Sequence, residues 1–153
     1  MRDYRKILAW QKADDLTVAV YEATKTFPKD EVYSLTSQIR RAAYSIPANI
    51  AEGASRNSQK DYLHFLYISR GSAAEVGYFI HLSRRLGYIN QEDHESLAAQ
   101  AAEASRILTG LIQSVEKETG VLARAAAKIT SAFILFLGSA CLRSSVYSLR
   151  SPV

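Results

Sequence analysis

One face of the segment 35–56 carries polar side chains at regular intervals. At 100° per residue, five of them fall in a narrow stripe: Gln38, Arg41, Ser45, Asn49 and Glu52. Spacings of three and four residues allow hydrogen bonds along a helix, and Glu75 from a later segment could complete the set. The stripe is interpreted either as a binding surface or as a structural network in which Glu52 or Glu75 neutralises Arg41. We favour the network, because satisfied polar groups commonly specify bundle packing.

A second set of residues could bind nucleic acid. The candidate cations are Arg40, Arg56, Lys60, Arg70, Arg84 and Arg85. Phosphate contacts need only clustered positive charge, and four tyrosines could stack on unpaired bases: Tyr44, Tyr62, Tyr67 and Tyr78. The alternative is that the cations lie on solvated helix faces and the tyrosines in core or subunit contacts.

Catalytic and metal-binding patterns are weak in this sequence. A bundle di-iron site requires two Glu-x-x-His pairs, and the chain offers only Asp61 followed by His64 at that spacing. Neither a zinc-protease motif nor a phosphate-binding glycine loop is present, and no serine has an evident triad. We therefore expect no enzymatic activity, no metal and no cofactor.

Apolar residues at alternating spacings of three and four predict the helices that position these groups. The expected helices cover residues 7–27, 31–53, 58–86 and 90–120. Pro28 should end the first helix, Pro47 should kink the second, and Gly53 and Gly87 are expected as C-terminal caps. The N-terminal signals of the last two helices are Ser58 with Asp61 and Asn90 with Asp93. Short connections predict an all-α, antiparallel up-and-down four-helix bundle.

The third expected helix is apolar on two sides. One stripe is Tyr62, Leu66, Ser69, Ala73, Val76 and Ile80, and its neighbour is Phe65, Ile68, Ser72, Phe79, Leu82 and Leu86. Such width indicates burial by bundle neighbours and by a second subunit. The small residues around Gly71 would allow another backbone to approach closely.

The excess positive charge of the chain lies in its last 35 residues. Residues 1–118 contain 15 Lys or Arg and 15 Asp or Glu, whereas residues 119–153 hold Arg124, Lys128, Arg143 and Arg150 and no acid. The apolar run from Ile129 to Leu142 has 14 residues, short of the roughly 17–25 that span a membrane. We expect a bundle in residues 1–118 and an apolar, basic extension of uncertain structure in 119–153: a fifth helix, an assembly contact or an appendage.

The cellular compartment follows from two features of the sequence. The single cysteine cannot form an intrachain disulfide, and residues 1–30 hold no signal-peptide run. A cytoplasmic protein is expected.

Four stretches resemble the family of 23S ribosomal RNA intervening-sequence proteins, over about residues 4–118. They are LAWQKADDL, FPKDEVYSLTSQIRRAAYSIPANIAEGASR, FLYISRGSAAEVGYFI and RRLGYI. The resemblance implies a small bacterial protein that forms a homopentamer of four-helix bundles. A similar fold serves as the accessory protein of diversity-generating reverse transcriptases, where a basic surface contacts nucleic acid and the polymerase.

Together these observations predict a non-catalytic, homo-oligomeric scaffold that binds structured RNA or DNA or assists a nucleic-acid enzyme. The alternative is a protein–protein interaction module without nucleic-acid contact. A peripheral membrane adaptor that uses residues 129–142 is a third, less favoured hypothesis, because that run is short.

Overall fold

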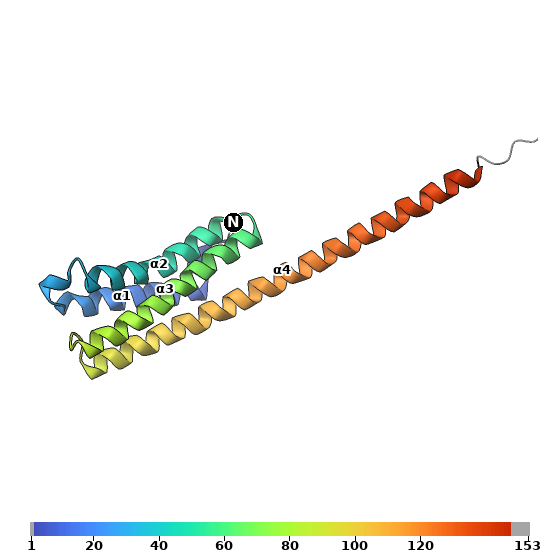
Figure 1. Ribbon diagram of the computed structural model, residues 1–153. Coiled ribbons are helices and arrows are strands. Elements are labelled where there is room, and N and C mark those ends of the chain that lie inside the picture. The colour runs from blue at the N-terminus through green and yellow to red at the C-terminus, as the bar shows by residue number, and fades with distance from the viewer. Residues whose placement is uncertain (1, 148–153) are drawn as a thin grey trace, which may run out of the picture. The chain divides into compact units, whose positions relative to one another are not determined.

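A computed structural model describes the backbone of residues 2–147 and the side chains of residues 2–120. Residues 2–147 form four α-helices: α1 (Leu8–Ala23), α2 (Leu35–Ser55), α3 (Gln59–Arg85) and α4 (Gln91–Tyr147). Three short 3₁₀ helices accompany them: η1 (Tyr4–Lys6), η2 (Thr24–Thr26) and η3 (Lys29–Glu31). The chain divides into two compact units, Met1–Glu116 and Lys117–Val153. In the first unit, α1, α2, α3 and the beginning of α4 run alternately up and down, which confirms the all-α four-helix bundle (Figure 1).

The helix ends follow the local rules of capping. Ser58 Oγ accepts a hydrogen bond from the backbone N–H of Asp61 at 3.0 Å, and Asn90 Oδ1 accepts one from Asp93 at 2.8 Å. Both satisfy N–H groups that lack a partner in the first turn. Gly87, just after α3, has a φ of +75°, the left-handed conformation that favours glycine after a helix. These three predictions are confirmed.

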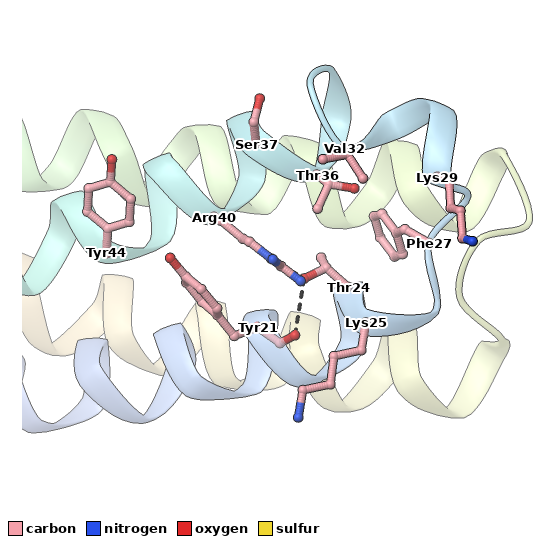
Figure 2. Close-up of a pocket in the computed structure, with 10 residues that line it drawn as sticks. All are labelled: Tyr21, Thr24, Lys25, Phe27, Lys29, Val32, Thr36, Ser37, Arg40 and Tyr44. Carbon is pink, nitrogen blue, oxygen red and sulfur yellow. Dashed lines mark hydrogen bonds between the residues drawn. The ribbon is translucent and has the colours of Figure 1, made fainter.

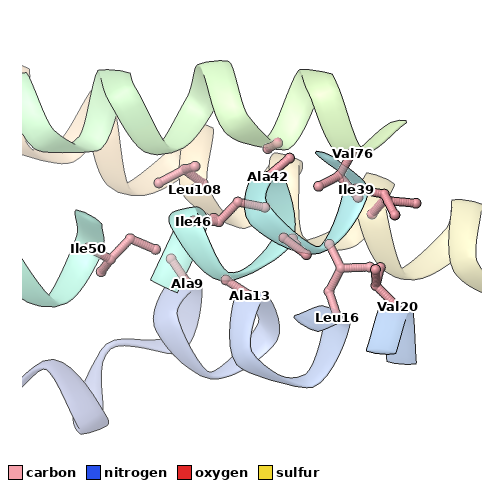
Figure 3. Close-up of a cluster of buried hydrophobic side chains, with 14 of the residues drawn as sticks. Ala9, Ala13, Leu16, Val20, Ile39, Ala42, Ile46, Ile50, Val76 and Leu108 are labelled. Atoms are coloured by element: carbon pink, nitrogen blue, oxygen red, sulfur yellow. The ribbon is translucent and has the colours of Figure 1, made fainter. Parts of the chain in front are cut away.

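The core is built from the predicted stripes of all four helices (Figure 3). The first α3 stripe is buried at every predicted position. The buried apolar stripe of α2 is formed by Leu35, Ile39, Ala42, Ala43, Ile46 and Ile50. Helix α1 contributes Ala9, Ala13, Leu16 and Val20, and α4 contributes Leu97, Ala101, Ala104, Leu108, Ile112 and Val115. The apolar spacing of residues 97–115 predicts Leu111 as a core residue, but Ile112 is the buried one and Leu111 is half-buried beside it.

Three expected helix boundaries differ from the structure by four residues or more. Helix α1 ends at Ala23 rather than at Phe27, because the chain continues as the 3₁₀ helix η2. Helix α2 begins at Leu35, four residues after Glu31, whose carboxylate accepts a hydrogen bond from the Leu35 N–H at 3.1 Å. The fourth helix was expected to end at Gly120, but α4 continues to Tyr147. A single glycine therefore does not end a helix when the residues after it favour helix.

Gly53 was expected as a cap, and this prediction was wrong. It is buried inside α2, which ends at Ser55. A Cβ on Gly53 would lie 2.8 Å from Phe65 Cβ and 3.0 Å from Tyr62 Cδ2 of α3. Glycine is needed here because α2 and α3 approach closely.

Pro47 lies within α2, and its neighbours compensate for the bond it removes. Proline has no N–H to offer the Ala43 carbonyl four residues before it. The Thr17 hydroxyl of α1 lies 3.0 Å from that carbonyl oxygen, as well as 2.8 Å from Ala13 O of its own helix. On the other side, Ser69 Oγ of α3 donates to Ile46 O at 3.0 Å. The proline is thus held between two neighbouring helices.

Within the described part of the chain, no helix combines the length and apolar character needed to cross a membrane. The expectations for the side chains of residues 129–142 fall outside the residues whose side chains are described.

Candidate functional site

The predicted polar stripe of α2 lies beside α3, and its centre is a small hydrogen-bonded group. Asn49 Nδ2 donates to Ser45 O at 2.8 Å and to Ser45 Oγ at 3.0 Å. Ser72 Oγ of α3 donates to Ser45 Oγ at 3.0 Å. These half-buried groups fix where α2 and α3 meet, as a structural network would.

The ends of the stripe face solvent. Gln38, Arg41 and Glu52 of α2 and Glu75 of α3 are exposed. Glu52 pairs with Arg56 one turn later, and Arg41 forms no ion pair with the described residues. The structure therefore brings together Ser45, Asn49 and Ser72, while Arg41 and Glu75 are exposed and Glu52 is paired with Arg56.

Apolar side chains on the same side of α3 as Ser72, together with Leu86 just after the helix, are only partly covered. Ile68 is 40% exposed and Leu86 is 49% exposed, while Phe79 and Leu82 are half-buried. Together with Arg41, Glu52 and Glu75 they form a mixed face, which we call the α2–α3 outer face. A surface with apolar side chains and charges of both signs is suited to protein contact.

No atom lies within 4 Å of a Cβ built on Gly71. The close approach expected at Gly71 does not occur inside the subunit, and contact with a second copy stays a prediction.

The predicted nucleic-acid cations do not form one cluster. Arg56 and Lys60 lie at the α2–α3 turn, whereas Arg84 and Arg85 lie at the other end of α3. At 1.5 Å per residue, Lys60 and Arg85 are about 37 Å apart along the helix. Arg84 Nε donates to Gln91 Oε1 at 3.1 Å and so contributes to the α3–α4 connection.

Three cations that sequence reasoning missed join Arg56 and Lys60. Arg2 N donates to Ala54 O at 3.1 Å, and Arg2 Nη2 donates to Gln59 Oε1 at 2.7 Å. These bonds bring Arg2, and after it Arg5 and Lys6, to the α2–α3 turn. Figure 1 shows the N-terminus at this end of the bundle. We call the five residues Arg2, Arg5, Lys6, Arg56 and Lys60 the basic end. The signal was present as RDYRK, but nothing in the sequence placed it beside the turn.

The remaining candidate residues are dispersed. Arg70 lies over the Tyr67 ring, with 4.9 Å from its guanidinium carbon to the ring centroid. Tyr44, Tyr67 and Tyr78 are exposed, whereas Tyr62 belongs to the core. Arg40 is half-buried and contacts α1, away from the basic end.

Neither the shifted pKa values nor the arrangement of metal-binding side chains indicates an active site in the described residues. The pKa of Glu31 is lowered chiefly by the Leu35 N–H and further by Ser34 and Tyr88, and the pKa of Tyr88 is raised chiefly by Glu31. The pKa of Tyr67 is raised chiefly by its hydrogen bond to Glu116. No group of three or more His, Cys, Asp or Glu side chains in this part of the chain could hold a metal ion.

Comparison with known proteins identifies a family and a similar solved structure. The sequence model described as "23S rRNA-intervening sequence protein" matches residues 5–110. A solved structure from Bacteroides thetaiotaomicron VPI-5482, described as a protein with unknown function from the S23 ribosomal protein family, is similar with a TM-score of 0.64 and 27% identity. The similarity covers 69% of this chain and 98% of that one. Among curated proteins, none matches this chain.

Proposed function

The chain belongs to the 23S rRNA-intervening sequence protein family, and from this membership we propose that it is a cytoplasmic, non-catalytic, homo-oligomeric scaffold for structured RNA. The observation that carries the proposal is that five cations lie at one end of the bundle. Arg5 pairs with Asp3 and Arg56 with Glu52, and Arg2, Lys6 and Lys60 have no acidic partner among the described residues. Phosphate recognition requires clustered positive charge rather than a particular sequence motif.

The basic end has charge available for an incoming phosphate. Lys6 and Lys60 are exposed and pair with no acid among the described residues. Arg56 is oriented by Glu52 and by the Phe65 ring, whose centroid lies 4.9 Å from the guanidinium carbon. Arg2 lies over the Tyr62 ring at 4.4 Å. The two arginines are thus pre-positioned, which reduces the entropy that they lose on binding.

Assembly would bring the basic ends of several copies together. The α2–α3 outer face supports self-association, because Ile68 and Leu86 gain burial there and Arg41 can pair with Glu75 of another copy. In a ring of five copies, the basic ends repeat around one rim and form a positive band. A band of this kind would bind RNA more tightly than one neutral subunit.

The RNA experiment uses the full chain and a structured ribosomal RNA fragment, with affinity measured from low to near-physiological salt. The test variant is Lys6→Gln/Lys60→Gln. The control is Arg70→Gln/Arg85→Gln, which removes the same charge from exposed residues outside the basic end. Because each phosphate contact contributes about 0.9 to the slope of log K against log salt, the test variant should lower that slope by about 1 to 2. The control should leave it unchanged.

The outcome separates the proposal from its alternative. No loss in either variant would place RNA binding outside both sets of residues, for example on the four cations of residues 119–153. Equal losses in both would indicate a non-specific effect of charge and would also contradict the basic end as the site. Absence of RNA binding at every salt concentration would favour a protein–protein interaction module. The equal numbers of acidic and basic residues in 1–118 make that module the second candidate.

Assembly is tested separately by native mass. Ile68→Glu places a charge on the α2–α3 outer face and should dissociate the oligomer, with little effect on the subunit because Ile68 is 40% exposed. Val18→Glu makes the same change on α1, where Val18 is 58% exposed, and should leave the mass unchanged. If only Val18→Glu dissociates the oligomer, assembly uses α1 and the outer face is excluded.

A further inference from the structure

A pocket of about 560 Å³ lies between the end of α1, the connection that follows it and the first turns of α2 (Figure 2). Its volume is within the range of small-molecule sites. The lining residues are Tyr21, Thr24, Lys25, Phe27, Lys29, Val32, Thr36, Ser37, Arg40 and Tyr44. The pocket shares no lining residue with the basic end, so variants of the two can be tested separately.

The lining of the pocket is positively charged. Lys25, Lys29 and Arg40 contribute three cations, and no carboxylate is among the lining residues. Glu22 pairs with Lys25 at 2.6 Å, so Lys29 and Arg40 carry the uncompensated charge. The neighbouring Glu31 carboxylate is already bonded to the Leu35 N–H and the Tyr88 hydroxyl. The pocket therefore favours an anion.

Arg40 is held in place for such a ligand. Its Nε donates to Thr24 Oγ1 at 2.7 Å, and its guanidinium carbon lies 4.8 Å from the centroid of the Tyr21 ring. Its two terminal nitrogens have no hydrogen-bond partner among the described residues. A guanidinium that is fixed through Nε presents its terminal nitrogens as a pair, which suits two oxygens of one phosphate group.

Thr36 provides a second, independent indication of a ligand. Its side chain is only 5% exposed, and its hydroxyl oxygen has no hydrogen-bond partner. Buried hydroxyls are rarely left unpaired, because the lost hydrogen bond with water is not replaced. Thr36 lies in the first turn of α2, where free N–H groups add a partial positive charge. The hydroxyl oxygen is itself covered, so a phosphate oxygen in the pocket would satisfy it after the Thr36 side chain rotates about χ1.

Aromatic side chains complete the pocket. Figure 2 shows the Tyr21 and Tyr44 rings to one side of the Arg40 guanidinium and Phe27 to the other. Tyr21 and Tyr44 are exposed and offer a surface for a flat ring. A site with a fixed guanidinium, an unpaired hydroxyl and aromatic walls combines phosphate and base recognition.

We propose that this pocket binds a nucleoside monophosphate, either free or as the 5′-phosphorylated end of an RNA strand. The phosphate binds the Arg40 guanidinium, the Lys29 and Thr36 side chains turn toward it from the positions in Figure 2, and the base stacks on an exposed tyrosine of the wall.

Calorimetric titration of the full chain tests the proposal with AMP, adenosine, inorganic phosphate, and an RNA oligonucleotide with or without a 5′-phosphate. AMP should bind, and adenosine should bind at least about tenfold more weakly, because it lacks the charge-assisted bonds. Binding of the oligonucleotide only when it is phosphorylated, more tightly than AMP, identifies the strand end as the source. Binding of inorganic phosphate as tight as that of AMP would refute the base subsite and overturn the proposal.

Two variants place the binding in this pocket. Arg40→Gln should weaken AMP binding at least about tenfold, whereas Arg41→Gln, the same change on the adjacent residue outside the pocket, should leave it unchanged. Thr36→Val keeps the shape of the side chain and removes an unpaired hydroxyl. It should weaken AMP binding several-fold while the melting temperature stays the same or rises. If AMP does not bind, or if both Arg40→Gln and Thr36→Val bind it like the wild type, the proposal is wrong.

Discussion

Replacing Gly53 with alanine should destabilise the bundle, although alanine is the better helix former. The added Cβ would lie 2.8 Å from Phe65 Cβ, an atom fixed to the α3 backbone, and 3.3 Å from the Tyr62 carbonyl oxygen. Neither contact is with the flexible end of a side chain. Helix α2 must therefore move away from α3, and the neighbouring Ser45–Ser72 bond and Ile50 packing must adjust with it.

The size of the effect follows from two opposing contributions. Overpacking of a tight contact typically costs about 1–3 kcal/mol. Replacing glycine with alanine inside a helix stabilises the helix by about 1 kcal/mol. Gly53→Ala should therefore lower the free energy of unfolding by about 0–2 kcal/mol. The control is Gly110→Ala in α4, where an added Cβ meets nothing within 4 Å, and it should raise that free energy by about 0.5–1 kcal/mol.

The assay is urea denaturation followed by circular dichroism, with all proteins at one concentration because assembly contributes to stability. The difference between the two variants isolates the steric contribution and should be about 1–3 kcal/mol. If Gly53→Ala gains as much stability as Gly110→Ala, the α2–α3 approach is not tight at this point and the reasoning fails.

Two further predictions concern individual hydrogen bonds. Thr17→Val should lower the free energy of unfolding by about 1–2 kcal/mol, because it leaves the Ala43 carbonyl without a donor. In a Pro47→Ala background the helical N–H returns, so the same change should cost less; a double-mutant cycle with no coupling would contradict this role of Thr17. The lowered pKa of Glu31 means that its hydrogen bonds contribute stability above its ordinary pKa of 4.5 and lose it as pH falls through the lowered pKa. At alkaline pH the sign reverses for Tyr88, whose raised pKa gives stability below 10 that is lost as pH rises through the raised pKa. As pH is lowered through the acidic range, the melting temperature of Glu31→Gln should therefore fall less steeply than that of the wild type. Parallel plots of melting temperature against pH would refute the stabilising role of the Glu31 carboxylate.

Much of the fold could be predicted because its signals are local. The residues that cap the last two helices, Ser58 and Asn90, act within three positions of themselves, and Gly87 acts through its own φ. The apolar stripes needed only the periodicity of a helix. Capping and periodicity were sufficient to identify the four-helix bundle.

The errors arose where the deciding partner is distant in sequence. A glycine near a helix end serves either as a cap or as a point of close approach between helices. Gly53 is a point of close approach because Phe65, on another helix, packs against it. Likewise, the helical wheel placed Arg40 off the polar stripe but did not reveal Thr24, sixteen residues earlier. The basic end depended on backbone bonds that bring Arg2 to Ala54. Contacts of this kind require the tertiary structure.

The arrangement around Pro47 also bears on how the protein folds. A segment of residues 35–55 on its own cannot complete its ladder of backbone bonds, because the Ala43 carbonyl finds its donor on α1 and not within α2. Completion of α2 and docking of α1 are therefore one event rather than two. The bundle should open cooperatively, and backbone amides of α1 and of the middle of α2 should exchange with solvent deuterium at a common rate.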